Sequence, residues 1–168
     1  MKTIFAGLVC SFFVGMIFSC SKETATSPID ANGVNLAGAK GSSKSWKLVN
    51  ATGSLNGGAT QPVTLDACFL DNLYTFSNNS AQVYQATEGA TKCNPSDSTI
   101  VEEGSWAFTA DAKSLLIDGN YYNSDGSLFT TLGQAVKIVQ LTSTNLSLSF
   151  TVTNSQGTIV YTLNFAKN

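Results

Sequence analysis

The strongest constraint on the fold is a regular alternation of apolar and mostly polar side chains near the C-terminus. Apolar residues occupy every second position of segments 146–152 and 159–165. Because successive side chains of a strand point to opposite faces, this pattern is typical of strands with one buried face. Residues 154–157 (Asn-Ser-Gln-Gly) lie between them and have the composition of a tight turn. The pattern predicts a C-terminal β-hairpin.

Six upstream segments also have strand character, and no convincing amphipathic helix of ten or more residues interrupts the series. Turn-like sequences such as 77–80 and 109–113 separate them, and 128–131 is a candidate for a short extra strand. Short strands at this spacing predict an all-β fold, an eight-stranded antiparallel up-and-down barrel, with a β-sandwich as the alternative. A barrel of this size packs its own side chains or holds one small ligand. The six predicted strands are 46–51, 73–76, 81–86, 104–109, 115–118 and 135–141.

The composition excludes several classes of function. The sequence contains no His and no Arg, and it has 11 acidic residues against nine Lys. Without His there is no Ser-His-Asp triad and no imidazole metal site, and without Arg there is no bidentate phosphate clamp. The adjacent Glu102 and Glu103 would point to opposite faces of a strand, so they cannot act as an acid–base pair. We therefore expect no enzymatic activity, no cofactor, no metal and no nucleic-acid partner.

The N-terminus reads as an export signal. Lys2 precedes an apolar run over residues 4–18, which is shorter than the roughly 20 residues of a membrane span. The end of the run, Ser19-Cys20, resembles a bacterial lipobox, in which a peptidase cuts before a diacylglycerol-modified Cys. The resemblance implies a signal peptide at 1–19, cleavage between Ser19 and Cys20, and a lipid on Cys20 that anchors the protein to a membrane. Cleavage by ordinary signal peptidase, with release of a soluble protein, is the alternative.

The segment after the signal is rich in Ser, Thr, Ala, Gly and Asn and shows no periodicity. We therefore expect residues 20–44 to be the lipidated Cys and a flexible linker, and residues 45–168 to form the folded domain. A short helix at 29–39 is a weaker alternative. By resemblance to lipoproteins generally, Ser21 after the anchor implies sorting to the bacterial outer membrane, on either its periplasmic face or the cell surface. We expect a monomer.

An ordered series of short motifs runs through the predicted domain and carries a family resemblance. The motifs are Ser-Trp-Lys-Leu at 45–48, Asp-Asn-Leu-Tyr-Thr-Phe at 71–76 after Cys68, Gly-Ser-Trp-Ala-Phe at 104–108, Leu-Leu-Ile at 115–117, and Ile-Val-Gln-Leu-Thr at 138–142 followed by Leu-Ser-Leu at 146–148. In this order they resemble the lipocalin-like domain of small Bacteroidota envelope lipoproteins. The resemblance implies an eight-stranded up-and-down barrel that is exported, lipid-anchored and without assigned catalysis. Family members usually have a Gly shortly before the Trp of the first strand, where this chain has Lys44 and Ser45. The wider lipocalin superfamily also packs an Arg from a late strand over this Trp, and this chain has no Arg.

Two cysteines remain once Cys20 carries a lipid and the signal is removed. An exported domain folds in an oxidising compartment, so Cys68 and Cys93 are predicted to form a structural disulfide. The bridge would join the loop before the second predicted strand to the loop after the third. A redox-active pair is the alternative, but the residues lack a Cys-x-x-Cys spacing.

Several aromatic and loop residues are candidates for binding or modification. Adjacent Tyr121 and Tyr122 are a candidate exposed recognition patch, and Ser98 in Asp97-Ser98-Thr99 matches a signal for O-glycosylation of exported proteins in Bacteroidota. Five aromatic residues on the apolar faces of strands either line a ligand pocket or fill the core. The core alternative is strongest for the Trp of the first strand, which stands where lipocalins plug the closed end. The five are Trp46, Tyr74, Phe76, Trp106 and Phe108.

Two functions are consistent with these features. The first is a non-enzymatic, lipid-anchored envelope protein that binds a small apolar or amphipathic ligand inside the barrel. The second is a solid-cored envelope accessory or interaction module that contacts a protein or glycan through its loops. Gly or Ala at inward-facing positions would favour the first, because they leave space that larger side chains would fill.

Overall fold

The computed structural model describes residues 26–122 and 135–168. The predicted signal peptide, Ser19, Cys20 and the candidate strand at 128–131 lie outside these residues. The elements in chain order are α1 (Pro28–Ala37), β1 (Ser43–Leu55), β2 (Gln61–Val63), α2 (Ala67–Leu70), β3 (Leu73–Ser77), β4 (Val83–Thr87), β5 (Ile100–Phe108), β6 (Ser114–Tyr121), β7 (Val136–Leu141), β8 (Asn145–Asn154) and β9 (Gly157–Lys167). Neither described helix is long and apolar enough to cross a membrane.

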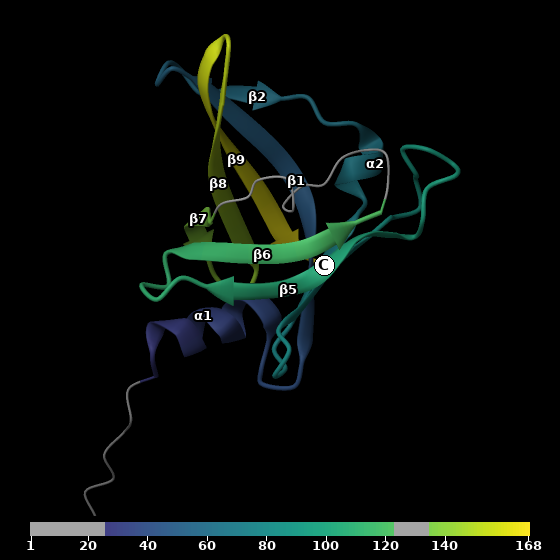
Figure 1. Ribbon diagram of the computed structural model, residues 1–168, viewed down its shortest axis with the longest axis vertical. Helices are drawn as coiled ribbons and strands as arrows, with labels where there is room; N and C mark the ends of the chain where they lie inside the picture. The colour runs from purple at the N-terminus through teal and green to yellow at the C-terminus, as the bar shows by residue number, and fades with distance from the viewer. Residues whose placement is uncertain (1–25, 123–134) are drawn as a thin grey trace, which may run out of the picture.

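The strands form one closed antiparallel barrel (Figure 1). From β3 to β9 each strand pairs with the next, and β9 pairs along β1 to close the barrel. One edge of β1 is shared: its first part pairs with β3 and its last part with the short β2. The structure confirms the predicted all-β, eight-stranded up-and-down barrel, and the alternative of a β-sandwich is wrong. Each of the eight predicted strands overlaps a strand of the structure.

A register shift in β1 sets which of its side chains enter the barrel. The pairing with β9 shifts between Leu48 and Asn50. Val49 lies at this irregularity and is 54% exposed, whereas Leu48 and Ala51 are buried. An extra residue in a strand changes the alternation of faces after it. The shift therefore continues the inward face from Leu48 to Ala51 and on toward Gly53.

Helix α1 lies across one end of the barrel, which we call the closed end (Figure 1). Leu36 and Ala37 at the end of the helix are fully buried, and the indole nitrogen of Trp46 donates a hydrogen bond of 2.8 Å to the Leu36 carbonyl. The Ser27 side chain caps the helix by accepting from the Asp30 amide.

This helix corrects the predicted domain boundary. The expected flexible linker at 20–44 contains α1 and the start of β1, so the folded domain begins before residue 45. The sequence carries little signal for this helix, because a ten-residue segment with an internal Gly33 has low intrinsic helicity. Packing of Leu36 and Ala37 against the barrel stabilises it instead.

The two ends of the barrel differ in their connections. Short turns at 78–82, 109–113 and 142–144 lie at the closed end with α1 and the end of β9. The opposite, open end holds the β1–β2 turn, the segment from β2 to β3 with α2, the β4–β5 loop and the β8–β9 turn. Long connections at one end of a rigid barrel are where a binding site is expected.

Candidate functional site: the open mouth of the barrel

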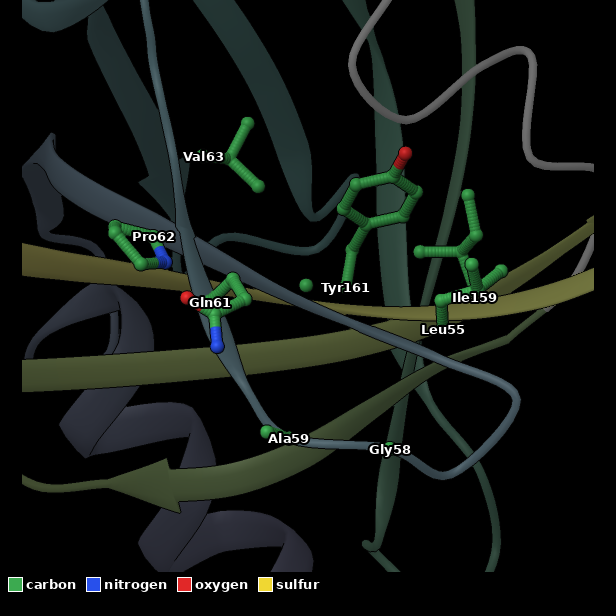
Figure 2. A pocket seen from close by; sticks show the side chains of 9 residues that line it. Leu55, Gly58, Ala59, Gln61, Pro62, Val63, Ile159 and Tyr161 are labelled. Atoms are coloured by element: carbon green, nitrogen blue, oxygen red, sulfur yellow. The ribbon is translucent and has the colours of Figure 1, made fainter.

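A cavity of about 370 Å³ opens at the mouth of the barrel, between the end of β1, β2 and the start of β9 (Figure 2). Most of its lining is apolar, and Gln61 and Tyr161 carry the polar side-chain groups. Protein sites for small molecules are typically concave and mostly apolar with a few polar groups. The lining residues are Gly53, Leu55, Gly58, Ala59, Gln61, Pro62, Val63, Ile159 and Tyr161.

Gly53 is the residue that leaves this space open. It is the strand partner of both Gln61 on β2 and Tyr161 on β9. A Cβ atom at Gly53 would lie 3.5 Å from Cγ2 of Val63 and 3.6 Å from the Tyr161 ring. Any larger side chain would extend between these two groups, so the absence of a side chain helps to form the cavity.

Contacts within the C-terminal hairpin hold Tyr161 in place. Its ring stacks on Phe150, with centroids 5.4 Å apart and an interplanar angle of 29°. The Ser149 hydroxyl donates a hydrogen bond of 2.8 Å to the Tyr161 carbonyl. The ring is therefore positioned before any ligand arrives, which lowers the entropy cost of binding.

At the rim of the cavity, two hydrogen bonds, which we call the clamp, join one turn to another. The Asn56 amide donates to the Thr158 carbonyl at 2.8 Å, and the Asn56 side-chain oxygen accepts from the Thr158 amide at 2.9 Å. Gly157 has φ +134°, and a Cβ there would lie 2.3 Å from the Asn56 side-chain oxygen. The positive φ favours glycine at this position, and a larger residue would also displace the Asn56 side chain. The clamp joins the β1–β2 turn to the β8–β9 hairpin.

Small residues and the buried carboxylate of Glu102 are also found inside the barrel. Ala51 and Ala86 are buried, at 2% and 1% exposure. Glu102, the strand partner of Ala86, is 1% exposed and accepts a hydrogen bond of 3.2 Å from the Tyr84 hydroxyl. Burial and then the charge of Glu102 raise the pKa of Tyr84 well above its ordinary value. Its neighbour Glu103 faces the other way, as the sequence predicts.

The five aromatic residues predicted to line a pocket lie elsewhere. Trp46, Phe76 and Trp106 are buried in the core, and Phe76 contacts Trp106 edge-on at a centroid distance of 6.2 Å. Tyr74 is buried against Phe165. Phe108 packs on Trp106, and both line a smaller groove of about 270 Å³ beside α1. None of the five is among the residues that line the mouth cavity.

The two predicted recognition tyrosines differ in exposure. Tyr121 ends β6 and is half-buried, whereas Tyr122 is 51% exposed. The Tyr122 hydroxyl donates a hydrogen bond of 2.8 Å to the carboxylate of Glu103. This hydrogen bond raises the pKa of Tyr122. The candidate modification site Ser98 is exposed in the β4–β5 loop, and its oxygen accepts from the Ile100 amide.

A disulfide joins Cys68 of α2 to Cys93 of the β4–β5 loop, with Cα atoms 5.2 Å apart. The predicted pairing is confirmed. Nearby, Asp71 accepts from the Thr91 amide and Asn72 accepts from the Gly89 amide, so the two loops are also joined by hydrogen bonds. Across the described segments 26–122 and 135–168, no three His, Cys, Asp or Glu side chains are grouped to hold a metal ion.

The sequence does not identify Gly53 or Val63 as site residues. A glycine at an inward-facing strand position was an available signal for Gly53, but its inward orientation depends on the register shift near Val49. Val63 belongs to a three-residue strand that the sequence pattern did not reveal. The alternation places Tyr161 on the apolar face of its strand, and its location at the mouth follows from the pairing of β9 with the end of β1.

Comparison with known proteins agrees with this architecture. No curated protein matches the chain. The family model of the lipocalin-like domain matches residues 43–165, which run from the first residue of β1 almost to the end of β9. This match covers most of the sequence and includes every strand of the barrel. The chain therefore belongs to the lipocalin-like domain family.

Proposed function

We propose that this protein is a non-enzymatic binding protein that holds a small apolar or amphipathic molecule at the open mouth of its barrel. The observation that carries the proposal is the mouth cavity of about 370 Å³, which Gly53 leaves open between Val63 and Tyr161. Its size falls within the range of roughly 300–1,000 Å³ that is typical of small-molecule sites. A lipocalin-like barrel is compatible with this role.

The lining favours a particular kind of ligand. Leu55, Val63 and Ile159 offer apolar walls, while the Tyr161 hydroxyl and the Gln61 amide offer hydrogen bonds at the edge. An apolar body with one or two polar groups matches this distribution. The core aromatics Trp46 and Phe76 are buried beneath, so the ligand would bind in the mouth and not at the closed end.

The proposal is tested by filling the cavity from Gly53. We expect Gly53→Leu to weaken binding of a neutral apolar fluorophore, N-phenyl-1-naphthylamine, at least tenfold, because the new side chain would occupy the space beside Tyr161. The matched control is Thr52→Leu, which adds a similar side chain at the adjacent position, on the opposite face of the strand. Equal binding by the two variants would exclude the cavity as the site and favour an interaction module acting through its loops.

We also propose that the protein is anchored to the bacterial outer membrane by a lipid on Cys20. The support is the apolar run that ends at Ser19-Cys20 and its resemblance to a lipobox. A diacylglycerol together with an amide-linked chain would bury enough methylene groups for stable anchoring. Metabolic labelling with an alkyne fatty acid should label the wild type and not Cys20→Ser. Labelling of both proteins would place the lipid elsewhere.

A further inference from the structure

Charged side chains are divided unequally between the two ends of the barrel. At the closed end, lysines outnumber acidic residues among the described positions. The basic residues there are Lys40, Lys44, Lys113, Lys137 and Lys167, and the acidic ones are Asp30 and Asp111. Lys137 is included because its strand partner is Ser114, next to the closed-end turn at 109–113.

The open end has the opposite charge. Among the described residues, Lys92 is the basic side chain of the open-end loops, and Lys47 lies midway along the barrel, where β1 pairs with the first residue of β3. The exposed or half-buried acidic residues there are Asp66, Asp71, Asp97 and Glu103, while Glu88 and Glu102 are buried. An anionic surface would therefore attract the closed end and repel the open end.

The closed end also carries exposed apolar side chains. Ile29 and Val34 of α1 are 42% and 49% exposed, although Leu36 of the same helix is fully buried. Both exposed residues border the groove of about 270 Å³ that Phe108 lines from the barrel side, and Lys40 lies at this groove. Asp30 of α1 also lines the groove, and Lys40 follows the helix in the chain. Exposed apolar side chains with lysines nearby are features of surfaces that bind in a lipid headgroup region.

The length of chain before α1 places this end near the anchor. Pro28 is eight residues after Cys20. Eight residues span at most about 29 Å when fully extended, and about 16 Å on average as a flexible coil. The 11 residues of β9 extend over about 36 Å. A lipid on Cys20 therefore keeps α1 closer to the bilayer than the open mouth is.

We propose that the closed end is a docking surface for an anionic lipid bilayer. Ile29 and Val34 enter the headgroup region, Lys40 and Lys113 contact anionic lipid groups, and the ligand mouth points away from the membrane. The inference rests on the proposed lipid anchor for its tether, while the docking surface itself depends on α1 and the lysines. Salt weakens this contact, because the Debye length falls from about 10 Å at 0.1 M to about 3 Å at 1 M.

Lysine footprinting of the full mature chain tests the proposal. The protein is placed on vesicles of phosphatidylcholine alone or with phosphatidylglycerol, and acetylation rates are read by mass spectrometry. We expect Lys40 and Lys113 to react several-fold more slowly on the anionic vesicles, with recovery at high salt, while Lys92 serves as the internal control at the open end. Protection of Lys92, or equal reactivity of all three residues on both vesicles, would overturn the proposal.

Paired substitutions separate docking from general effects on the fold. Val34→Ser should abolish most of the protection, whereas Val160→Ser, which replaces a Val that is 39% exposed near the open-end start of β9, should leave it intact. Equal protection in the two variants would exclude α1 as the contact. Intact mass reports the lipid on Cys20 separately. An unlipidated protein that still shows the footprint would disprove the anchor and support the docking surface.

Discussion

The ammonium nitrogen of Lys44 lies 5.3 Å from the centroid of the Trp46 ring, where α1 meets the barrel. The same nitrogen donates hydrogen bonds to the carbonyls of Asn35 and of Ser143, the latter at 3.2 Å. One side chain thus joins the last turn of α1, the first strand and the β7–β8 turn. Burial, and then the charge of Lys167, lowers the pKa of Lys44.

This contact replaces an interaction that is usual in lipocalins. Lipocalins pack an Arg from a late strand over the Trp of the first strand, and this chain has no Arg. Here the cation over Trp46 comes from Lys44, two residues earlier on the same strand. A lysine at this position also reaches the carbonyl groups that α1 leaves unsatisfied at its C-terminus.

We expect Lys44→Met to destabilise the protein by about 1–3 kcal/mol. The substitution keeps an apolar stem of similar length but removes the charged hydrogen bonds and the cation–π contact. Lys47→Met on the same strand is the control and should change the free energy of unfolding by less than about 0.5 kcal/mol. Urea unfolding measures both, and equal effects would show that Lys44 has no special role.

Helix α1 offers a matched pair of substitutions that tests whether it belongs to the folded domain. Leu36 is fully buried, so Leu36→Ala should cost about 2–5 kcal/mol of unfolding free energy. Val34 is 49% exposed, so Val34→Ala should cost less than about 0.5 kcal/mol. Thermal or urea unfolding gives both values. If the two variants were equally stable, α1 would be a dispensable part of the tether.

The buried pair of Tyr84 and Glu102 predicts a specific response to alkaline pH. The pKa of Tyr84 in the folded state is raised above its ordinary value of 10.0. At a pH between 10.0 and the pKa of the folded state, the folded protein therefore keeps a proton that the unfolded chain has lost. The contribution of Tyr84 to the free energy of unfolding is therefore fully present below about pH 10 and is lost as the pH rises further. The lowered pKa of Lys44 acts in the opposite direction in the same range.

Tyr84→Phe isolates the tyrosine from other groups that titrate. At pH 7 the variant should be about 1–3 kcal/mol less stable, because the Glu102 carboxylate loses a buried donor. Unfolding free energies from pH 8 to 11.5 should show the difference from wild type shrinking above pH 10. Tyr122→Phe, at an exposed position, is the control. A difference in unfolding free energy that stays constant from pH 8 to 11.5 would contradict a raised pKa of Tyr84 in the buried pair with Glu102.

Removal of the disulfide with Cys68→Ser and Cys93→Ser together should lower the unfolding free energy by about 3.5 kcal/mol in the chain-entropy model. The bridge connects residues 25 apart in sequence, so its loss frees the unfolded chain more than it disturbs the barrel. Circular dichroism of the double variant should still report β structure, and urea unfolding gives the stability. A loss below about 1 kcal/mol would show that the hydrogen bonds of these loops suffice.

The strands could be predicted from sequence because each obeys a local rule. Alternation of apolar and polar residues over 146–152 and 159–165 identifies both strands without knowledge of their partners. The buried Leu163 and Phe165 of β9 follow this alternation, whereas in β8 Ser147 and Ser149 are buried together with the neighbouring leucines. The Cys68–Cys93 pair was predictable because few pairings remained. Helix α1 was not predictable with the same certainty, since its stability comes from the burial of Leu36 against residues that follow it in the chain.

The binding site was harder to predict than the fold for a similar reason. Aromatic side chains such as Trp46 and Trp106 are suited both to a pocket and to a core. The tertiary contacts decide between the two, because the Trp46 indole donates to the Leu36 carbonyl of α1 and the Trp106 indole donates to the Ser77 carbonyl of β3. The mouth cavity depends on Gly53, whose orientation follows from a register shift, and on the three residues of β2. Neither feature leaves a periodic pattern in the sequence.

Native mass spectrometry of the exported Cys20→Ser protein, purified from an envelope extract of its own host, tests ligand binding at the mouth most directly. We predict a bound mass of a few hundred daltons that is lost on denaturation, and that Gly53→Leu reduces while Thr52→Leu does not. A ligand-free mass in all three proteins, together with no binding of the apolar fluorophore by the wild type, would contradict a binding function for the cavity.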